Sequence, residues 1–137
     1  MAKIKLLVDT DILVDYLKGI RAARELFKTK EVDLYCSILS KKELLSKEGL
    51  KNSEKEQIFN ILSKVKVLKI DDGINKKYFY LMKKYGEKPE WLADYIIAAT
   101  AWSKRLPLLT RNRKHFAHIE EITLSTGYEV ERNQRQK

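Results

Sequence analysis

Four polar side chains stand beside or within apolar segments of this chain: Asp9, Glu43, Asp94 and Asn112. Asp9 ends the apolar run of residues 3–8, and Asp94 lies inside the apolar segment 91–99. A carboxylate beside or inside a buried element is unfavourable unless a partner compensates its charge. A hard divalent cation compensates several acidic groups when the fold brings them together. A metal-dependent active site is therefore the first hypothesis.

The donor types favour one class of metal. Mg²⁺ and Mn²⁺ prefer oxygen ligands in octahedral geometry and keep several waters, which suits three carboxylates and a carboxamide. Two histidines and one cysteine are too few for a convincing zinc site. An ion held by few protein ligands completes its shell with substrate phosphate, so the expected reaction is phosphodiester hydrolysis.

Each of the four residues also has a purely structural interpretation. Asp9 could cap the helix that follows it, and Asn112 could cap a helical turn at 113–116. Glu43 ends the pattern Ser-Lys-Lys-Glu at 40–43, which matches a capping box. Asp94 is the hardest to explain structurally, because its helix is apolar around much of its circumference. The joint pattern is more informative than any single member.

Apolar periodicity predicts strands that alternate with helices along the chain. The strands are expected at residues 3–8, 32–37, 64–70, 106–110 and, at an edge, 121–124. The helices are expected at 12–18, 20–28, from 40 onwards, 53–63, 71–84, 91–103 and 113–116. This alternation indicates an α/β fold, with helices on both faces of a central, mostly parallel sheet of four to five strands.

The predicted topology brings the polar residues to one edge. Ligands of open parallel sheets bind beyond the carboxyl ends of the strands. Asp9 and Asn112 come directly after strands, and Glu43 and Asp94 lie early in helices. All four are therefore expected at the same edge of the sheet.

Composition limits the remaining possibilities. A chain of 137 residues suits one domain, expected at 1–128, followed by a polar tail at 129–137. No apolar stretch is long enough for a membrane helix, and the single cysteine fits a reducing compartment, so a cytoplasmic location is expected. The net charge of +9 suggests a polyanionic partner such as nucleic acid, although lysines beside glutamates also occur on solvated helix faces.

Four segments resemble those of a known family: 7–13 (LVDTDIL), 40–44 (SKKEL), 94–101 (DYIIAATA) and 108–116 (LLTRNRKHF). In this order they resemble the PIN-domain ribonucleases, and within them the VapC-type toxins of prokaryotic toxin–antitoxin pairs. The resemblance extends from Ile4 to about Leu124. It implies a PIN-like three-layer α/β/α fold and a Mg²⁺- or Mn²⁺-dependent endoribonuclease that inhibits translation by cutting a structured RNA.

The resemblance also assigns roles. It implies that Asp9, Glu43 and Asp94 are the catalytic metal-site residues, with the neutral Asn112 positioning water or supporting the ion. Thr110 is the candidate hydroxyl near the metal. Further residues match the family and also have simpler roles: Thr10 and Asp11 (helix capping), His115 and Phe116 (packing), and Arg111 and Arg113 (RNA phosphate or a solvated loop). A cognate antitoxin and a homodimer are the implied partners.

Two other functions compete with this one. Asp9-Thr10-Asp11 after a strand resembles the nucleophile loop of haloacid dehalogenase-like phosphatases, with Asp71 and Asp72 as the later acidic pair. That interpretation leaves Asp94 unexplained. The second alternative is a catalytically inactive PIN-like module that binds RNA or protein. The neutral Asn112 favours it, and the three retained carboxylates argue against it.

Overall fold

A computed structural model describes residues 3–130 of the chain. The strands are β1 Ile4–Val8, β2 Val32–Ser37, β3 Lys66–Leu68 and β4 Leu108–Leu109. They form one sheet in the order β3-β2-β1-β4, and each neighbouring pair is parallel. The predicted mostly parallel sheet of four to five strands is confirmed, and β1 lies inside it, between β2 and β4.

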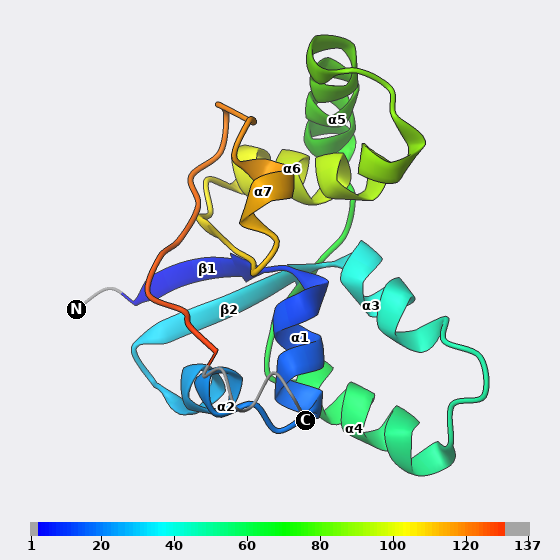
Figure 1. The fold of residues 1–137 in the computed structure, drawn as a ribbon, viewed down its shortest axis with the longest axis vertical. Coiled ribbons are helices and arrows are strands. Elements are labelled where there is room, and N and C mark those ends of the chain that lie inside the picture. Colours follow the sequence, from blue (N-terminus) through cyan, green and yellow to red (C-terminus); the bar gives the residue numbers. More distant parts are fainter. Residues whose placement is uncertain (1–2, 131–137) are drawn as a thin grey trace.

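Helices cover both faces of this sheet. The helices are α1 Thr10–Leu17, α2 Arg21–Lys28, α3 Ile38–Leu45, α4 Asn52–Leu62, α5 Asp72–Tyr85, α6 Leu92–Lys104 and α7 Arg113–Phe116, with a short 3-10 helix η1 at Pro89–Trp91. In Figure 1, α1 to α4 lie on one side of the strands and α5 to α7 on the other. This is the expected three-layer α/β/α arrangement.

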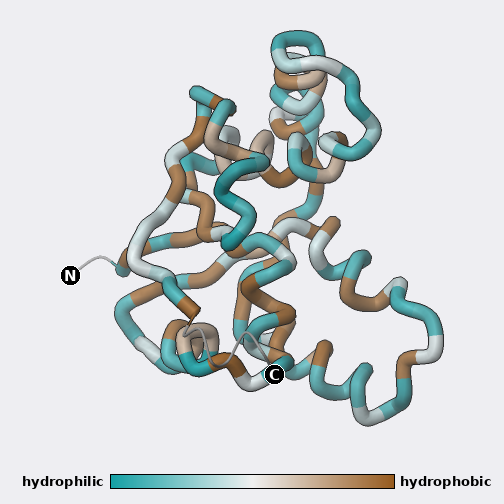
Figure 2. The backbone as a smooth tube through the Cα atoms, viewed as in Figure 1, coloured by the Kyte–Doolittle hydropathy of each residue, from teal (hydrophilic) through white to brown (hydrophobic). Residues whose placement is uncertain are grey.

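The core divides into two clusters because neighbouring side chains of a strand point to opposite faces. Leu7 and Leu108 pack with α5, α6 and α7, while Leu6, Val8 and Leu109 pack with α1 to α4. Figure 2 shows hydrophobic residues along the strands and hydrophilic residues along the segment leading into α7. A sheet buried on both faces holds the ends of its strands in fixed positions, and those ends carry the site.

Two local predictions are wrong. The capping box at 40–43 does not open a helix, because α3 already begins at Ile38, where the Ser37 hydroxyl accepts from Leu39 N at 3.1 Å. The expected strand at 121–124 is reduced to one parallel bridge between Leu108 and Leu124. Lys84 Nζ and Tyr85 Oη hold the Glu121 carboxylate at 2.6 and 2.7 Å, which ties that segment to α5.

The end of the domain expected at residue 128 stays a prediction, and a tertiary contact lies at that residue. Tyr128 Oη donates to Asp15 Oδ2 of α1 at 2.8 Å, so the chain is still tied to the domain at this residue. Residues 131–137 of the expected tail lie outside the described residues. No helix within residues 3–130 combines the length and apolar character needed to cross a bilayer.

Candidate active site

The ends of β1 and β4 place Asp9 beside Thr110. Val8 pairs with Leu109, and Asp9 N donates to Leu109 O at 2.9 Å. The side chains that follow the two strands are therefore neighbours, and Thr110 Oγ1 donates to Asp9 Oδ2 at 2.8 Å. Thr110 is buried, as is Asp9. The hydroxyl expected near the acidic site lies in direct contact with its first carboxylate.

Among the described residues, the buried Asp9 carboxylate has no cationic side chain to compensate its charge. Its Oδ1 caps α1 by accepting from Thr10 N at 2.8 Å, so the capping interpretation holds for one oxygen. Only 8% of Asp9 is exposed, and no basic side chain within residues 3–130 forms an ion pair with it. Burial, followed by the charges of Asp11 and Asp94, raises the pKa of Asp9 to about 6, although hydrogen bonds from Thr110 and Thr10 oppose the shift.

Glu43 reaches the same edge from α3. It lies in the later part of that helix, so the capping-box explanation of this residue is wrong. Thr10 Oγ1 is 2.8 Å from Ser40 Oγ and 3.3 Å from Glu43 Oε1, which links α3 to the start of α1. Burial and the nearby charge of Asp94 raise the pKa of Glu43, against a lowering effect of the Thr10 hydrogen bond.

Asp94 approaches from the opposite face of the sheet, in the first turn of α6. Its charge raises the pKa of Asp9 and of Glu43, which places the three carboxylates in one electrostatic neighbourhood. Asp94 Oδ2 is 3.0 Å from His115 Nδ1. His115 was expected to serve in packing, but its side chain is 46% exposed and contacts this carboxylate. Phe116 does pack, and is fully buried.

Asn112 closes the loop between β4 and α7. Its N–H donates to Thr110 Oγ1 at 3.0 Å, which orients the Thr110 hydroxyl toward Asp9. The side chain of Asn112 makes no capping hydrogen bond to α7, so the capping alternative is wrong. Its exposed carboxamide remains available for water or a ligand.

Asp11 does not cap α1 as expected, but crosses to the β4–α7 loop. Its Oδ2 accepts from Arg111 N at 3.0 Å and lies 3.3 Å from Thr110 Oγ1. Its Oδ1 is buried without a hydrogen-bonding partner among residues 3–130. Burial raises the pKa of Asp11, while the hydrogen bond from Arg111 N and the charge of Arg111 oppose the shift. The Thr10 hydroxyl also does not cap α1, because it contacts Ser40 and Glu43 of α3.

The two arginines expected to contact RNA are both engaged within the chain. Arg111 Nε forms an ion pair with Asp15 Oδ2 at 2.8 Å, and Arg113 Nη1 donates to Ser125 O at 2.7 Å. Asp15 is 3% exposed and also accepts from Tyr128. Asp15 is not among the residues expected from the sequence. The pattern that could have identified it is an acidic residue one turn after Asp11 on a largely apolar helix.

The acidic side chains form an open arrangement. Within residues 3–130, no three Asp, Glu, His or Cys side chains converge closely enough to enclose an ion. The donors are oxygens under mutual repulsion, and one buried Asp11 oxygen lacks a partner. Such a set fits a hard cation that keeps several waters, and it does not fit zinc. Burial raises the pKa of the Cys36 thiol to about 12, which excludes a thiolate nucleophile at neutral pH.

Asp71 and Asp72 would be the later acidic pair of a phosphatase, but in this structure they lie at the start of α5. Asp71 Oδ1 caps α5 by accepting from Ile74 N at 2.9 Å, and its Oδ2 pairs with Lys104 Nζ at 2.6 Å. Asp72 follows in the first turn of α5 and is exposed. Neither residue belongs to the edge that carries Asp9.

Comparisons with known proteins show the family to which this chain belongs. The PIN domain family model matches residues 6–122. Ribonuclease VapC1 of Methanocaldococcus jannaschii is 35% identical over 88% of this chain and 85% of its own length. Ribonuclease VapC10 of Mycobacterium tuberculosis is 31% identical over 85% of this chain and 90% of its own length. A chain of a toxin–antitoxin complex from Klebsiella pneumoniae superposes with a TM-score of 0.72 and 31% identity, covering 91% of this chain and 99% of that one. The chain therefore belongs to the PIN-domain family, and within it to the VapC ribonucleases.

Proposed function

We propose that this protein is the toxin of a toxin–antitoxin pair, an endoribonuclease that hydrolyses phosphodiester bonds in a structured RNA and thereby inhibits translation. One observation carries the proposal. Asp9 caps α1, Asp94 lies in the first turn of α6 and Glu43 lies late in α3, and all three share one electrostatic neighbourhood at one edge of the sheet. The buried Asp9 has no basic partner among residues 3–130. Uncompensated carboxylates of this kind are expected at a site that takes up a cation.

The proposed cofactor is Mg²⁺ or Mn²⁺, held by Asp9, Glu43 and Asp94. When bound, such an ion supplies a water of lowered pKa and neutralises charge on the phosphate oxygens. Thr110 and Thr10 keep two of the carboxylates in place through contacts of 2.8 and 3.3 Å. Asn112 is neutral, so its carboxamide is assigned to orienting water or substrate and not to acting as a base.

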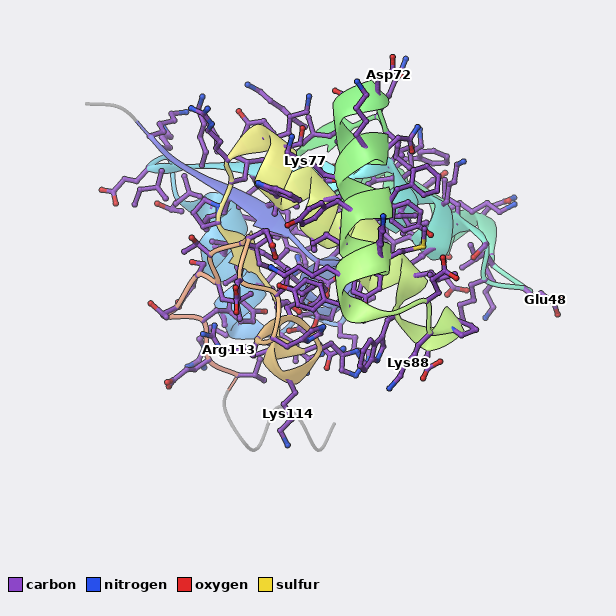
Figure 3. All side chains as sticks on the ribbon, turned by 90° about the horizontal axis from the view of Figure 1, so that it is seen from above. Glu48, Asp72, Lys77, Lys88, Arg113 and Lys114 are labelled. Atoms are coloured by element: carbon purple, nitrogen blue, oxygen red, sulfur yellow. The ribbon has the colours of Figure 1, made fainter. Side chains whose placement is uncertain are left out.

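Basic side chains beside the site are the proposed contacts to RNA phosphate. Figure 3 shows Lys88, Arg113 and Lys114 toward one side of the molecule, opposite Asp72. Lys88 and Lys114 are exposed, and α7 ends close to Asp94 through His115. Arg113 is exposed as well, although one of its nitrogens is bound to Ser125 O. The net charge of +9 favours the approach of a polyanion to this surface.

The proposed protein partners are a cognate antitoxin that blocks the site and a second copy of this chain. The Klebsiella pneumoniae relative was solved as a toxin–antitoxin complex, which supports the first partner. Phe79 and Tyr80 of α5 are 60% and 51% exposed, so α5 offers aromatic surface for such contacts. A nuclease that acts on translation would work in the cytoplasm.

The test is cleavage of total RNA by purified protein free of antitoxin, with Mg²⁺, with Mn²⁺ and with EDTA. Asp9→Asn removes a charge at the site while keeping the size of the side chain. Asp72→Asn is its matched control, because Asp72 is an exposed acidic residue at the start of α5. We expect discrete fragments from the wild type and from Asp72→Asn, and a loss of roughly 10³-fold in Asp9→Asn.

Two outcomes would contradict the proposal. Fragments that persist in EDTA and in Asp9→Asn would assign the cleavage to a contaminating nuclease. No metal-dependent cleavage by the wild type would favour the inactive RNA- or protein-binding module. Mapping of the fragment ends then identifies the RNA that is cut.

A further inference from the structure

The imidazole of His115 is attached to one of the three acidic residues of the site. Its Nδ1 lies 3.0 Å from Asp94 Oδ2, and this is the contact between the side chains of α7 and the start of α6. An ionised carboxylate only accepts hydrogen bonds, so Nδ1 is the donor in this pair. Asp94 is 18% exposed, which leaves the carboxylate accessible from the site.

The position of His115 is fixed by its neighbours in α7. Phe116 is fully buried in the core cluster beneath α5 and α6. Arg113 Nη1 donates to Ser125 O at 2.7 Å, and Ala117 N donates to Arg113 O at 2.9 Å. A helix of one turn has little stability alone, so these anchors determine where it lies. His115 is therefore held against Asp94 by structure on both sides of it in the sequence.

The hydrogen bond occupies one of the two oxygens of Asp94. Among residues 3–130, Asp94 Oδ1 has no hydrogen-bonding partner. The Asp94 charge contributes to the raised pKa of both Asp9 and Glu43, so Asp94 lies in their electrostatic neighbourhood. A carboxylate with one oxygen fixed and the other unpaired offers a single preferred direction to a cation.

We propose that His115 is a positioning residue, which holds Asp94 Oδ2 so that Asp94 Oδ1 is presented to the cation of the acidic site. This inference rests on the proposed function for the identity of that cation. Outer hydrogen bonds of this kind orient metal-binding carboxylates, and their removal typically lowers metal affinity about 10- to 100-fold. His115 itself stays outside the set Asp9, Glu43 and Asp94 that holds the ion.

The alternative is that His115 merely joins α7 to α6. The two roles differ in what a substitution changes. Loss of a simple tether lowers the stability of the metal-free protein and leaves the affinity for Mn²⁺ unchanged in the folded fraction. Loss of a positioning residue lowers the affinity for Mn²⁺ and is repaired by any side chain that donates from the same place. Asparagine does so, because its Nδ2 occupies a position like that of histidine Nδ1.

The experiment measures Mn²⁺ dissociation constants by titration calorimetry on the full chain, for wild type, His115→Ala, His115→Asn and His118→Asn. His118 is the matched control: it is an exposed histidine three residues further on, and its ring contacts Tyr85 and Trp91 instead of a carboxylate. We expect His115→Ala to bind Mn²⁺ about 10-fold or more weakly. We expect His115→Asn to recover most of that loss and His118→Asn to match the wild type. Thermal unfolding in EDTA shows whether each variant is folded.

Three results would overturn the inference. The first is unchanged Mn²⁺ affinity in His115→Ala, and the second is an affinity of His115→Asn as low as that of His115→Ala. The third is a wild type that binds no Mn²⁺. The proposed nuclease can fail separately, because Mn²⁺ binding that depends on His115, in a protein that cuts no RNA, would retain the positioning role and reject the nuclease. If the positioning role and the nuclease are both correct, a high Mn²⁺ concentration restores RNA cleavage to His115→Ala but not to Asp94→Asn.

Discussion

Helix α1 carries two buried aspartates at opposite ends, and their surroundings differ in one respect. Asp15 is 3% exposed and contacts both Arg111 Nε and Tyr128 Oη at 2.8 Å. Asp9 is 8% exposed and receives hydrogen bonds from Thr10 N and Thr110 Oγ1, which carry no charge. Within residues 3–130 the chain thus supplies a cation for Asp15 and none for Asp9.

We interpret this difference as that between a structural acidic residue, Asp15, and the proposed metal-binding residue, Asp9. A buried carboxylate that already has an arginine and a hydroxyl needs nothing from solution. A buried carboxylate with raised pKa, close to two further acidic side chains, destabilises the fold until a cation arrives. The same helix can therefore hold the C-terminal segment in place at Asp15 and present a binding site at Asp9.

The pH dependence of stability is the largest expected difference between the two ends. The folded pKa of Asp9 is about 6, above the value of about 3.9 in unfolded chains. Between these two values the folded state binds more protons than the unfolded state, so the free energy of unfolding falls as pH rises. Two units correspond to about 3 kcal/mol, lost between about pH 4 and pH 7. Urea denaturation in EDTA across this range should show the loss in wild type.

Asp9→Asn isolates this contribution from those of other groups. The difference in free energy of unfolding between Asp9→Asn and wild type should increase with pH by about 3 kcal/mol, because asparagine does not titrate. Asp72→Asn, a substitution of the same chemistry at an exposed site, is the matched control. If the free energies of unfolding of Asp9→Asn and wild type change with pH in parallel, Asp9 is not a carboxylate whose ionised form destabilises the fold.

Asp15→Asn should change stability in the opposite direction. The substitution removes the charge that accepts from Arg111 and Tyr128, and hydrogen bonds to a charged group contribute about 2 kcal/mol. The Arg111 side chain is 36% exposed, so its charge can regain water and the loss stays below that of a fully buried pair. Urea denaturation at pH 7 measures it. A double-mutant cycle with Arg111→Gln should show coupling, and additive effects would rule out the ion pair as the cause.

The location of the site could be predicted from the sequence because parallel strands end at one edge. Asp9 ends a short apolar run and Thr110 ends another, and strand pairing alone places such residues side by side. Strand pairing does not indicate which side chains from distant segments become partners. Nothing local to Asp15 indicates Arg111 or Tyr128, which are 96 and 113 residues away in the chain.

Predictions from local motifs are wrong where a tertiary contact determines the position of a side chain. The pattern at 40–43 is a good capping box, yet Ser37 caps the helix three residues earlier and Ser40 is buried against Thr10. His115 and Phe116 match a pair of the resembled family and are both predicted to pack, but consecutive residues of a helix face different directions. The contact of His115 with Asp94 depends on how α7 sits on α6, which the sequence alone does not specify.

Tyr128→Phe tests the weaker half of the Asp15 contact. It removes one hydroxyl donor and leaves the Arg111 ion pair, so the free energy of unfolding should fall by about 1 kcal/mol, less than in Asp15→Asn. Burial and the hydrogen bond to Asp15 raise the pKa of Tyr128, so its ultraviolet titration should be absent from the ordinary tyrosine range. A fall in stability equal to that of Asp15→Asn would place the whole effect on the tyrosine and reduce the importance of the ion pair.

The smallest expected effect concerns which basic residues near the site contact RNA. Lys114 is exposed and forms no ion pair within residues 3–130, whereas the charge of Arg111 is matched by Asp15. In an Asp9→Asn background that prevents cleavage, Lys114→Ala should lower the slope of log affinity against log salt by about 0.7 to 0.9, the value expected for one phosphate contact. Arg111→Gln should leave this slope unchanged, because a charge already paired within the protein releases no counterion from RNA.

Fluorescence anisotropy with a labelled RNA at several salt concentrations measures both slopes. A larger change in Arg111→Gln than in Lys114→Ala would mean that RNA competes with Asp15 for Arg111, and the two ends of α1 would then be coupled through the substrate.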